Sequence, residues 1–153
     1  MNEVTLDALE AVGSALAHKG RLRILALLRE GDLYVCQIRM VLGLAPSTAS
    51  AHLAILHRSG LVTEHKEGRW VRYSLTDEEP LGSVVREILY LVKEDRQILD
   101  DARVLGAVRR VPPDSLCRAG LDMTATGIEG RGCRRGRPAP AQEHRVAPAT
   151  RPT

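Results

Sequence analysis

Residues 45–60 constrain the fold most, because an apolar stripe and a set of small polar side chains share one short segment. Ala49, Leu53 and Leu56 recur at the spacing of one buried helix face. The opposite face carries small or polar groups: Ser47, Thr48, Ser50, His52 and Arg58. A helix with these two faces can lie close in a DNA major groove. The alternative is an ordinary amphipathic surface helix, since periodicity alone does not identify a partner.

The segments before residue 45 predict a helix-turn-helix. Apolar stripes predict three helices, over about 6–16, 22–28 and 35–42. Gly43-Leu44-Ala45 is a connection of helix-turn-helix length. Pro46 suits the first turn of the fourth helix, where its missing N–H costs nothing, and Gly60 suits the end of that helix.

The segments after residue 60 predict a β-hairpin. Two short strands, 61–65 and 70–75, flank a connection in which Gly68 supplies the turn. The predicted fold class is therefore mainly α with a small β-hairpin wing, a winged helix-turn-helix. Three cations are placed at or near the wing tip, with the length to reach phosphates or a minor groove: Lys66, Arg69 and Arg72.

A long apolar stripe predicts one helix from residue 79 or 80 to residue 108. This helix and the first helix carry more apolar surface than a small domain covers, so we expect both to pack against a second copy of the chain. A homodimer places two reading helices on double-stranded operator DNA about one turn, roughly 34 Å, apart. We assign 1–110 to a DNA-binding and dimerisation domain, 111–118 to a short segment, and 119–153 to a disordered basic tail.

Charge and composition narrow the classes of protein further. Residues 109–153 hold nine arginines against four acidic residues and contribute +5, whereas residues 1–108 contribute −2, so the formal net charge of +3 comes from the C-terminal segment. There is no apolar run of about 18 residues and no basic leader, so we expect a cytoplasmic protein without a membrane partner. Three cysteines at wide spacing do not form a disulfide framework. An enzyme is not expected, because no paired carboxylates, His–Cys spacing or glycine-rich phosphate loop stands out.

A set of segments lies in a fixed order and spacing along the chain: Gly20-Arg21-Leu22-Arg23-Ile24-Leu25, Asp32-Leu33-Tyr34-Val35-Cys36-Gln37-Ile38, Leu42-Gly43-Leu44-Ala45-Pro46-Ser47-Thr48-Ala49-Ser50-Ala51-His52-Leu53, Gly60-Leu61-Val62, and Glu67-Gly68-Arg69-Trp70-Val71-Arg72-Tyr73. Through these segments the chain closely resembles the ArsR family of bacterial repressors, over about residues 10–105. The resemblance implies a homodimeric winged helix that binds an operator and releases it when a metal or metalloid binds.

The resemblance also implies individual roles. It places these side chains at DNA-contacting positions: Ser47, Thr48, Ser50, His52 and, at the wing tip, Arg69. Ala51 stands where relatives often carry a polar or basic residue, so one base contact is missing or is replaced by contact with a thymine methyl group. For His52 the alternative is a histidine whose hydrogen bonds are satisfied where the helix meets the body of the domain.

The expected inducer site departs from the family pattern. Arsenite-responsive members often carry Cys-Val-Cys at the start of the third helix and a further Cys three residues on, whereas this chain has Tyr34-Val35-Cys36 and then Arg39. The segment 113–118 resembles the ending of a subgroup with a downstream Cys. We therefore expect Cys36 and Cys117, within one chain or across the dimer, to bind trivalent arsenic or antimony as inducer, with Cys133 as a candidate third thiol.

Other interpretations stay open at this stage. In one interpretation, Cys36 is a small buried core residue and Cys117 has no role. In another, the same two thiols form a redox pair. A protein-interaction module without DNA binding is a third. A zinc site on the last helix is disfavoured because residues 80–108 contain no histidine, and no permanently bound cofactor is expected.

Overall fold

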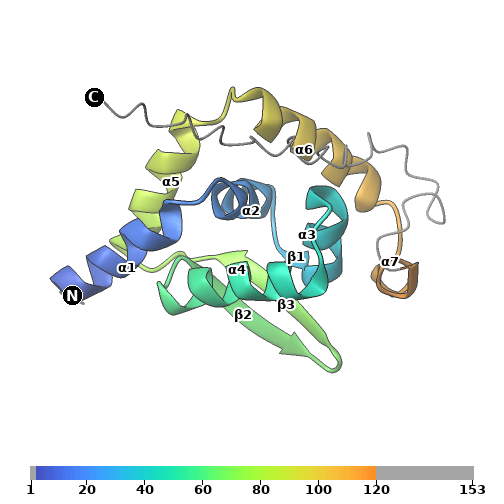
Figure 1. Cartoon of the computed structure of the whole chain (residues 1–153), viewed down its shortest axis with the longest axis horizontal. Helices are drawn as coiled ribbons and strands as arrows, with labels where there is room; N and C mark the ends of the chain where they lie inside the picture. The colour runs from blue at the N-terminus through green and yellow to red at the C-terminus, as the bar shows by residue number, and fades with distance from the viewer. Residues whose placement is uncertain (1–2, 120–153) are drawn as a thin grey trace, which may run out of the picture.

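The computed structural model describes residues 3–119, which form a helical body with a protruding hairpin (Figure 1). The elements, in chain order, are α1 (Leu6–Leu16), α2 (Lys19–Arg29), β1 (Leu33–Tyr34), α3 (Val35–Leu42), α4 (Pro46–Arg58), β2 (Val62–Glu67), β3 (Trp70–Leu75), α5 (Leu81–Leu91), α6 (Arg96–Val108) and α7 (Pro113–Ala119). The strands form one antiparallel sheet of order β1-β3-β2. The predicted winged helix-turn-helix is confirmed.

The helix-turn-helix is formed by α3 and α4, which meet at an angle of 115°. Gly43 ends α3 in the left-handed region, with φ 64°, and its N–H donates to the carbonyl of Arg39. Pro46 is in the first turn of α4, as predicted. At the other end Gly60 has φ 74° and its N–H donates to the carbonyl of His57, so glycine ends this helix too.

The core lies around α2, which packs against α1, α4, α5 and α6 (Figure 1). Its apolar face is almost wholly buried, with Ile24 and Leu25 inaccessible to solvent. The buried face of α4, formed by Ala49, Leu53 and Leu56, rests on this core as the periodicity predicted. Burial of that stripe fixes which side of α4 faces outward.

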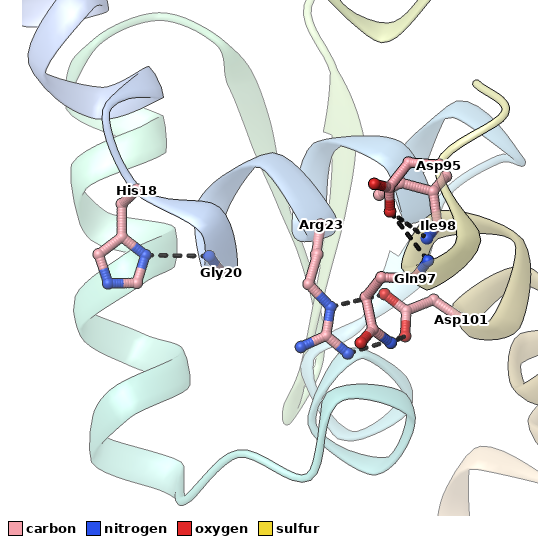
Figure 2. Close-up of polar contacts among 7 residues, drawn as sticks. All are labelled: His18, Gly20, Arg23, Asp95, Gln97, Ile98 and Asp101. Carbon is pink, nitrogen blue, oxygen red and sulfur yellow. Dashed lines mark hydrogen bonds and ion pairs between the residues drawn. The ribbon is translucent and has the colours of Figure 1, made fainter. Parts of the chain in front are cut away.

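The single long helix predicted for 80–108 is wrong, because the structure has two helices there, α5 and α6. Val92 caps α5, and Asp95 begins α6 by accepting hydrogen bonds on Oδ1 from the N–H groups of Gln97 and Ile98 (Figure 2). A side chain that satisfies these N–H groups stabilises a helix start. The two-residue strand β1 was not predicted.

Large apolar side chains remain exposed on α1, α5 and α6. Leu6 is 85% exposed and Leu91 is 81% exposed, and the others are Leu9, Val84, Tyr90 and Leu99. Within residues 3–119 no single helix is long and apolar enough to cross a bilayer, and only the bent α3–α4 pair passes that test by length and composition. Cys133 and the predicted tail, apart from Ala119, lie outside the described residues.

Candidate nucleic-acid interface and thiol pair

The outer face of α4 carries the side chains predicted to read DNA. Ser47, Thr48 and Ser50 are exposed in the first half of the helix, and Ala51 is exposed beside them. Because short side chains keep the helix backbone accessible, this face can approach base edges closely. The DNA contacts themselves stay a prediction.

His52 lies between the reading face and the body of the domain. Its ring is 4.5 Å from the ring of His18, centroid to centroid, at an interplanar angle of 49°. His18 is fixed in turn, since its Nδ1 accepts the N–H of Gly20 at 3.0 Å (Figure 2). Burial lowers the pKa of His52, and the charges of His18 and Arg21 lower it further. His52 therefore favours the neutral form and joins α4 to the start of α2.

The wing is formed by β2 and β3, with Gly68 and Arg69 at its tip. Gly68 has φ 60°, the left-handed conformation that a tight hairpin turn requires. Lys66 is exposed on β2. Nη2 of Arg69 lies 2.8 Å from Oδ1 of Asp114, and its guanidinium lies 4.8 Å from the centroid of the Trp70 ring.

Arg72 lies further from the wing tip than Arg69 does, and its predicted contact with DNA stays a prediction. It lies within β3, in register with Tyr34 on one side and His65 on the other. Its guanidinium is 2.7 Å from carboxylate oxygens of both Asp32 and Glu67. Arg72 therefore forms ion pairs with two carboxylates of the protein, and these pairs connect the wing to the segment at β1.

The two cysteines within the described residues are brought together by α3 and α7. Cys36 is buried at the start of α3, and its Sγ lies 3.9 Å from the carbonyl oxygen of Pro113. Cys117 is half-buried on α7, which packs against α3, and both cysteines are free thiols. Leu116, only 1% exposed, anchors α7 in the core. The two cysteines predicted as ligands therefore lie on packed helices of one chain, and the binding of a metalloid by them stays a prediction.

The surroundings of Cys117 favour the neutral thiol. Burial, as the largest cause, and the neighbouring Cys36 raise the pKa of Cys117 to about 12. Arg39 opposes this rise. Among residues 3–119 no three His, Cys, Asp or Glu side chains converge as a metal site. Cys36 and Cys117 are therefore the two candidate thiol ligands within these residues, and Cys133 lies outside them.

Two residues of these sites were missed in the sequence, His18 and Asp114. Asp114 precedes Cys117 by three residues, one helical turn, and this spacing was the available signal once α7 is assigned as a helix. His18 carries no comparable signal, because its contact with His52 spans 34 positions and arises only in the folded chain.

Comparisons with known proteins agree with this geometry. The family model described as "Bacterial regulatory protein, arsR family" matches residues 18–64. The HTH-type transcriptional regulator CmtR of Mycobacterium tuberculosis is 42% identical over 90 residues, which cover 57% of this chain and 76% of the relative. The arsenical resistance operon repressor of Escherichia coli is 42% identical over 66 residues, which cover 42% of this chain and 56% of the relative.

A solved structure gives the same fold. The homodimeric winged helix-turn-helix DNA-binding domain Mb0332 from Mycobacterium bovis is 34% identical, with a TM-score of 0.52. The match covers 60% of this chain and 83% of that one.

Proposed function

Because the chain belongs to the ArsR family of bacterial transcriptional repressors, we propose that a trivalent metalloid bound by Cys36 and Cys117 releases it from its operator. The inducer is arsenite, antimonite or a monosubstituted organoarsenical. The observation that carries the proposal is the packing of α7 against α3, which brings Cys117 near Cys36 and sets the Cys36 Sγ 3.9 Å from the carbonyl oxygen of Pro113 on α7. The likeness to an arsenical resistance operon repressor supports it.

The repressor binds DNA as a homodimer through two copies of α4 and two wings. Ser47, Thr48 and Ser50 supply short hydrogen-bonding groups to base edges and phosphates, and His52 lies at the inner end of this face. Lys66 and Arg69 bind phosphates at the wing. Arg72 supports the wing, since both of its carboxylate partners belong to the protein. The exposed apolar surface of α1, α5 and α6 supports pairing with a second copy.

The chemistry of the thiol pair suits trivalent arsenic and antimony, which are soft and favour sulfur ligands. Each thiol displaces one hydroxide from the metalloid, and the thiol proton leaves with that hydroxide as water. An organoarsenical with two hydroxides is fully satisfied by Cys36 and Cys117, whereas arsenite keeps one hydroxide or takes a third thiol. The bound metalloid bridges α3 and α7 of one chain.

A thiol-redox trigger is the second candidate, and the same proximity of Cys36 to Cys117 favours it. Peroxide accepts two electrons from the two thiols, which join as a disulfide while two molecules of water form. The two triggers are separable because dithiothreitol reverses the disulfide, and peroxide acts without any metalloid.

The test is a DNA-binding titration on the fragment upstream of the gene for this chain, with arsenite and with phenylarsine oxide. Wild type is expected to release the fragment, whereas Cys36→Ser and Cys117→Ser stay bound. Cys133→Ser is the matched control and is expected to release with phenylarsine oxide as wild type does. The metalloid trigger is wrong if wild type stays on DNA, or if both single variants release normally.

A further inference from the structure

We propose that Asp114 of α7 pairs with Arg69 at the wing tip and thereby keeps Arg69 from binding DNA. Operator affinity is therefore lower while α7 is docked on α3. The inference rests on the proposed release of DNA by a metalloid, and it says how metalloid binding at α7 lowers the affinity of the wing for DNA. It makes Asp114 a positioning residue that acts through Arg69.

The contact joins the tip of the wing to the helix that carries Cys117. Nη2 of Arg69 lies 2.8 Å from Oδ1 of Asp114, although the two residues are 45 positions apart in the chain. Trp70 lies under the guanidinium, and its ring packs edge-on against Tyr34 at 6.4 Å between centroids. Arg69 is therefore drawn back toward α7 and the start of α3.

The paired arrangement opposes DNA binding because the guanidinium nitrogen that holds Asp114 is no longer available to a phosphate. The side chains of Arg69 and Asp114 are 67% and 48% exposed, so their mutual attraction is weak and a phosphate can compete for Arg69. The contact thus lowers affinity without abolishing binding.

The position of Asp114 depends on how firmly α7 is docked. Leu116 is buried in the core, and Cys36 contacts the carbonyl of Pro113. Asp114 and Cys117 are one turn apart on α7, so a metalloid that joins Cys117 to Cys36 keeps Asp114 beside Arg69. A ligand that binds the docked arrangement better shifts the population toward it. Inducer binding then holds the wing cation away from DNA.

Neighbouring charges set the background of this contact. Arg118 lies 3.4 Å from Oδ2 of the same carboxylate and competes weakly with Arg69. Glu67, beside the turn, is occupied by Arg72 at 2.7 Å and by the hydroxyl of Tyr34 at 2.8 Å. Asp114 is therefore the carboxylate that engages Arg69 in the described part of the chain.

The experiment measures operator affinity at several salt concentrations without metalloid, for wild type, Asp114→Asn, Arg69→Ala and the double variant. Asp114→Asn is expected to tighten binding by about two- to five-fold per wing, the range of an exposed ion pair. Its salt dependence is expected to steepen by about one phosphate contact per wing. Arg69→Ala is expected to weaken binding, and adding Asp114→Asn to it is expected to change nothing further.

Asp100→Asn is the matched control. It removes the same charge from an aspartate on α6 that pairs with Arg103, and affinity is expected to stay at the wild-type value. The inference is overturned if Asp114→Asn binds like wild type, or if its tightening persists in the Arg69→Ala background, where only bulk charge remains. Thermal unfolding of each variant identifies any effect that comes from loss of folding.

A second arm adds phenylarsine oxide. Asp114→Asn is expected to bind the reagent with wild-type stoichiometry but to lose less DNA affinity than wild type does. Equal release by both proteins overturns the link between α7 and the wing. Wild type can stay on DNA in the presence of the reagent while the double variant still shows that Asp114 acts through Arg69. In that case the proposed metalloid trigger is wrong, and the effect of Asp114 on Arg69 is supported.

Discussion

Arg23 of α2 and Asp101 of α6 meet through two parallel contacts, Nε to Oδ2 and Nη2 to Oδ1, both 2.7 Å (Figure 2). Asp101 is 4% exposed and accepts a third hydrogen bond from Nε2 of Gln97 at 3.0 Å. The planar guanidinium matches the carboxylate in this arrangement. Because α2 also packs against α4, the ion pair links the reading part of the domain to α6.

Asp101→Ala is expected to lower the free energy of unfolding by about 2–4 kcal/mol, because it removes the nearly buried carboxylate that makes two contacts with the Arg23 guanidinium. Urea denaturation measures the change. Asp100→Ala, at the adjacent position in an exposed pair with Arg103, is expected to cost less than about 1 kcal/mol. Equal losses in the two variants would contradict a special role for the Arg23–Asp101 pair.

Ser47→Ala and Ser50→Ala are each expected to weaken operator binding by about 1–3 kcal/mol, the value of a lost contact in the groove. Both side chains are exposed, so the unfolding free energy is expected to stay within about 0.5 kcal/mol of wild type. Fluorescence anisotropy and thermal melts measure the two quantities. Ser83→Ala, on α5, is the control with the same chemical change. A pair of serine variants that binds DNA normally would remove α4 from the interface.

The fold was largely predictable because its elements carry local signals. Apolar spacing predicted the buried face of α4, and glycines at 43, 60 and 68 predicted the ends of helices and the turn of the wing. The break between α5 and α6 was not predicted because it contains neither glycine nor proline. Asp95 can be recognised as a helix cap only once the start of α6 is known. Strand β1 depends on pairing with β3, almost forty residues away.

The candidate sites were predictable to different degrees for the same reason. The exposed serines follow from periodicity, whereas the pairing of Cys36 with Cys117 came from resemblance to a family and not from spacing. Arg72 and Arg69 were treated alike because both are cations of the wing. Their partners, Asp32 and Asp114, lie 40 and 45 residues away in the chain, so only the folded structure separates a supporting cation from one at the tip.

His52 is expected to titrate below its ordinary pKa of 6.5, because burial and the nearby charges of His18 and Arg21 disfavour its protonated form. A lowered pKa means that the stability from neutral His52 is fully present above pH 6.5 and is lost as pH falls through the lower folded value. Unfolding measured between pH 7.5 and pH 5 tests this, with NMR titration of the ring. His52→Gln is expected to reduce the acid dependence.

His57→Gln provides the matched control for this pH dependence. His57 is exposed on the same helix, so its removal is expected to leave the acid dependence of unfolding as in wild type. Identical pH profiles for His52→Gln and wild type would show that the contact between His52 and His18 does not control the acid dependence of unfolding.

Leu91→Glu is expected to convert the proposed homodimer to a monomer at micromolar concentration and to weaken operator binding. Leu91 is 81% exposed on α5, and burying a charge at an apolar contact carries a large desolvation cost. Sedimentation velocity measures the oligomeric state. Lys66→Glu, on the wing, is the control and is expected to remain dimeric while it binds DNA less well. A dimeric Leu91→Glu would place the dimer contact elsewhere on the surface.

Alkylation of Cys117 is expected to accelerate about tenfold per pH unit from pH 7 to pH 10 without levelling off, because only the thiolate reacts. Its pKa is about 12, above the ordinary 9.0, chiefly through burial. Stability that depends on the neutral thiol is therefore fully present below pH 9.0 and is lost as pH rises toward 12.

Cys36→Ser removes the charge of Cys36 but not the burial, so the pKa of Cys117 is expected to fall only part of the way toward 9.0. Peptide-resolved mass spectrometry follows the reaction beside a free cysteine derivative, and a plateau for Cys117 at the pH of that reference would contradict its packing against α3.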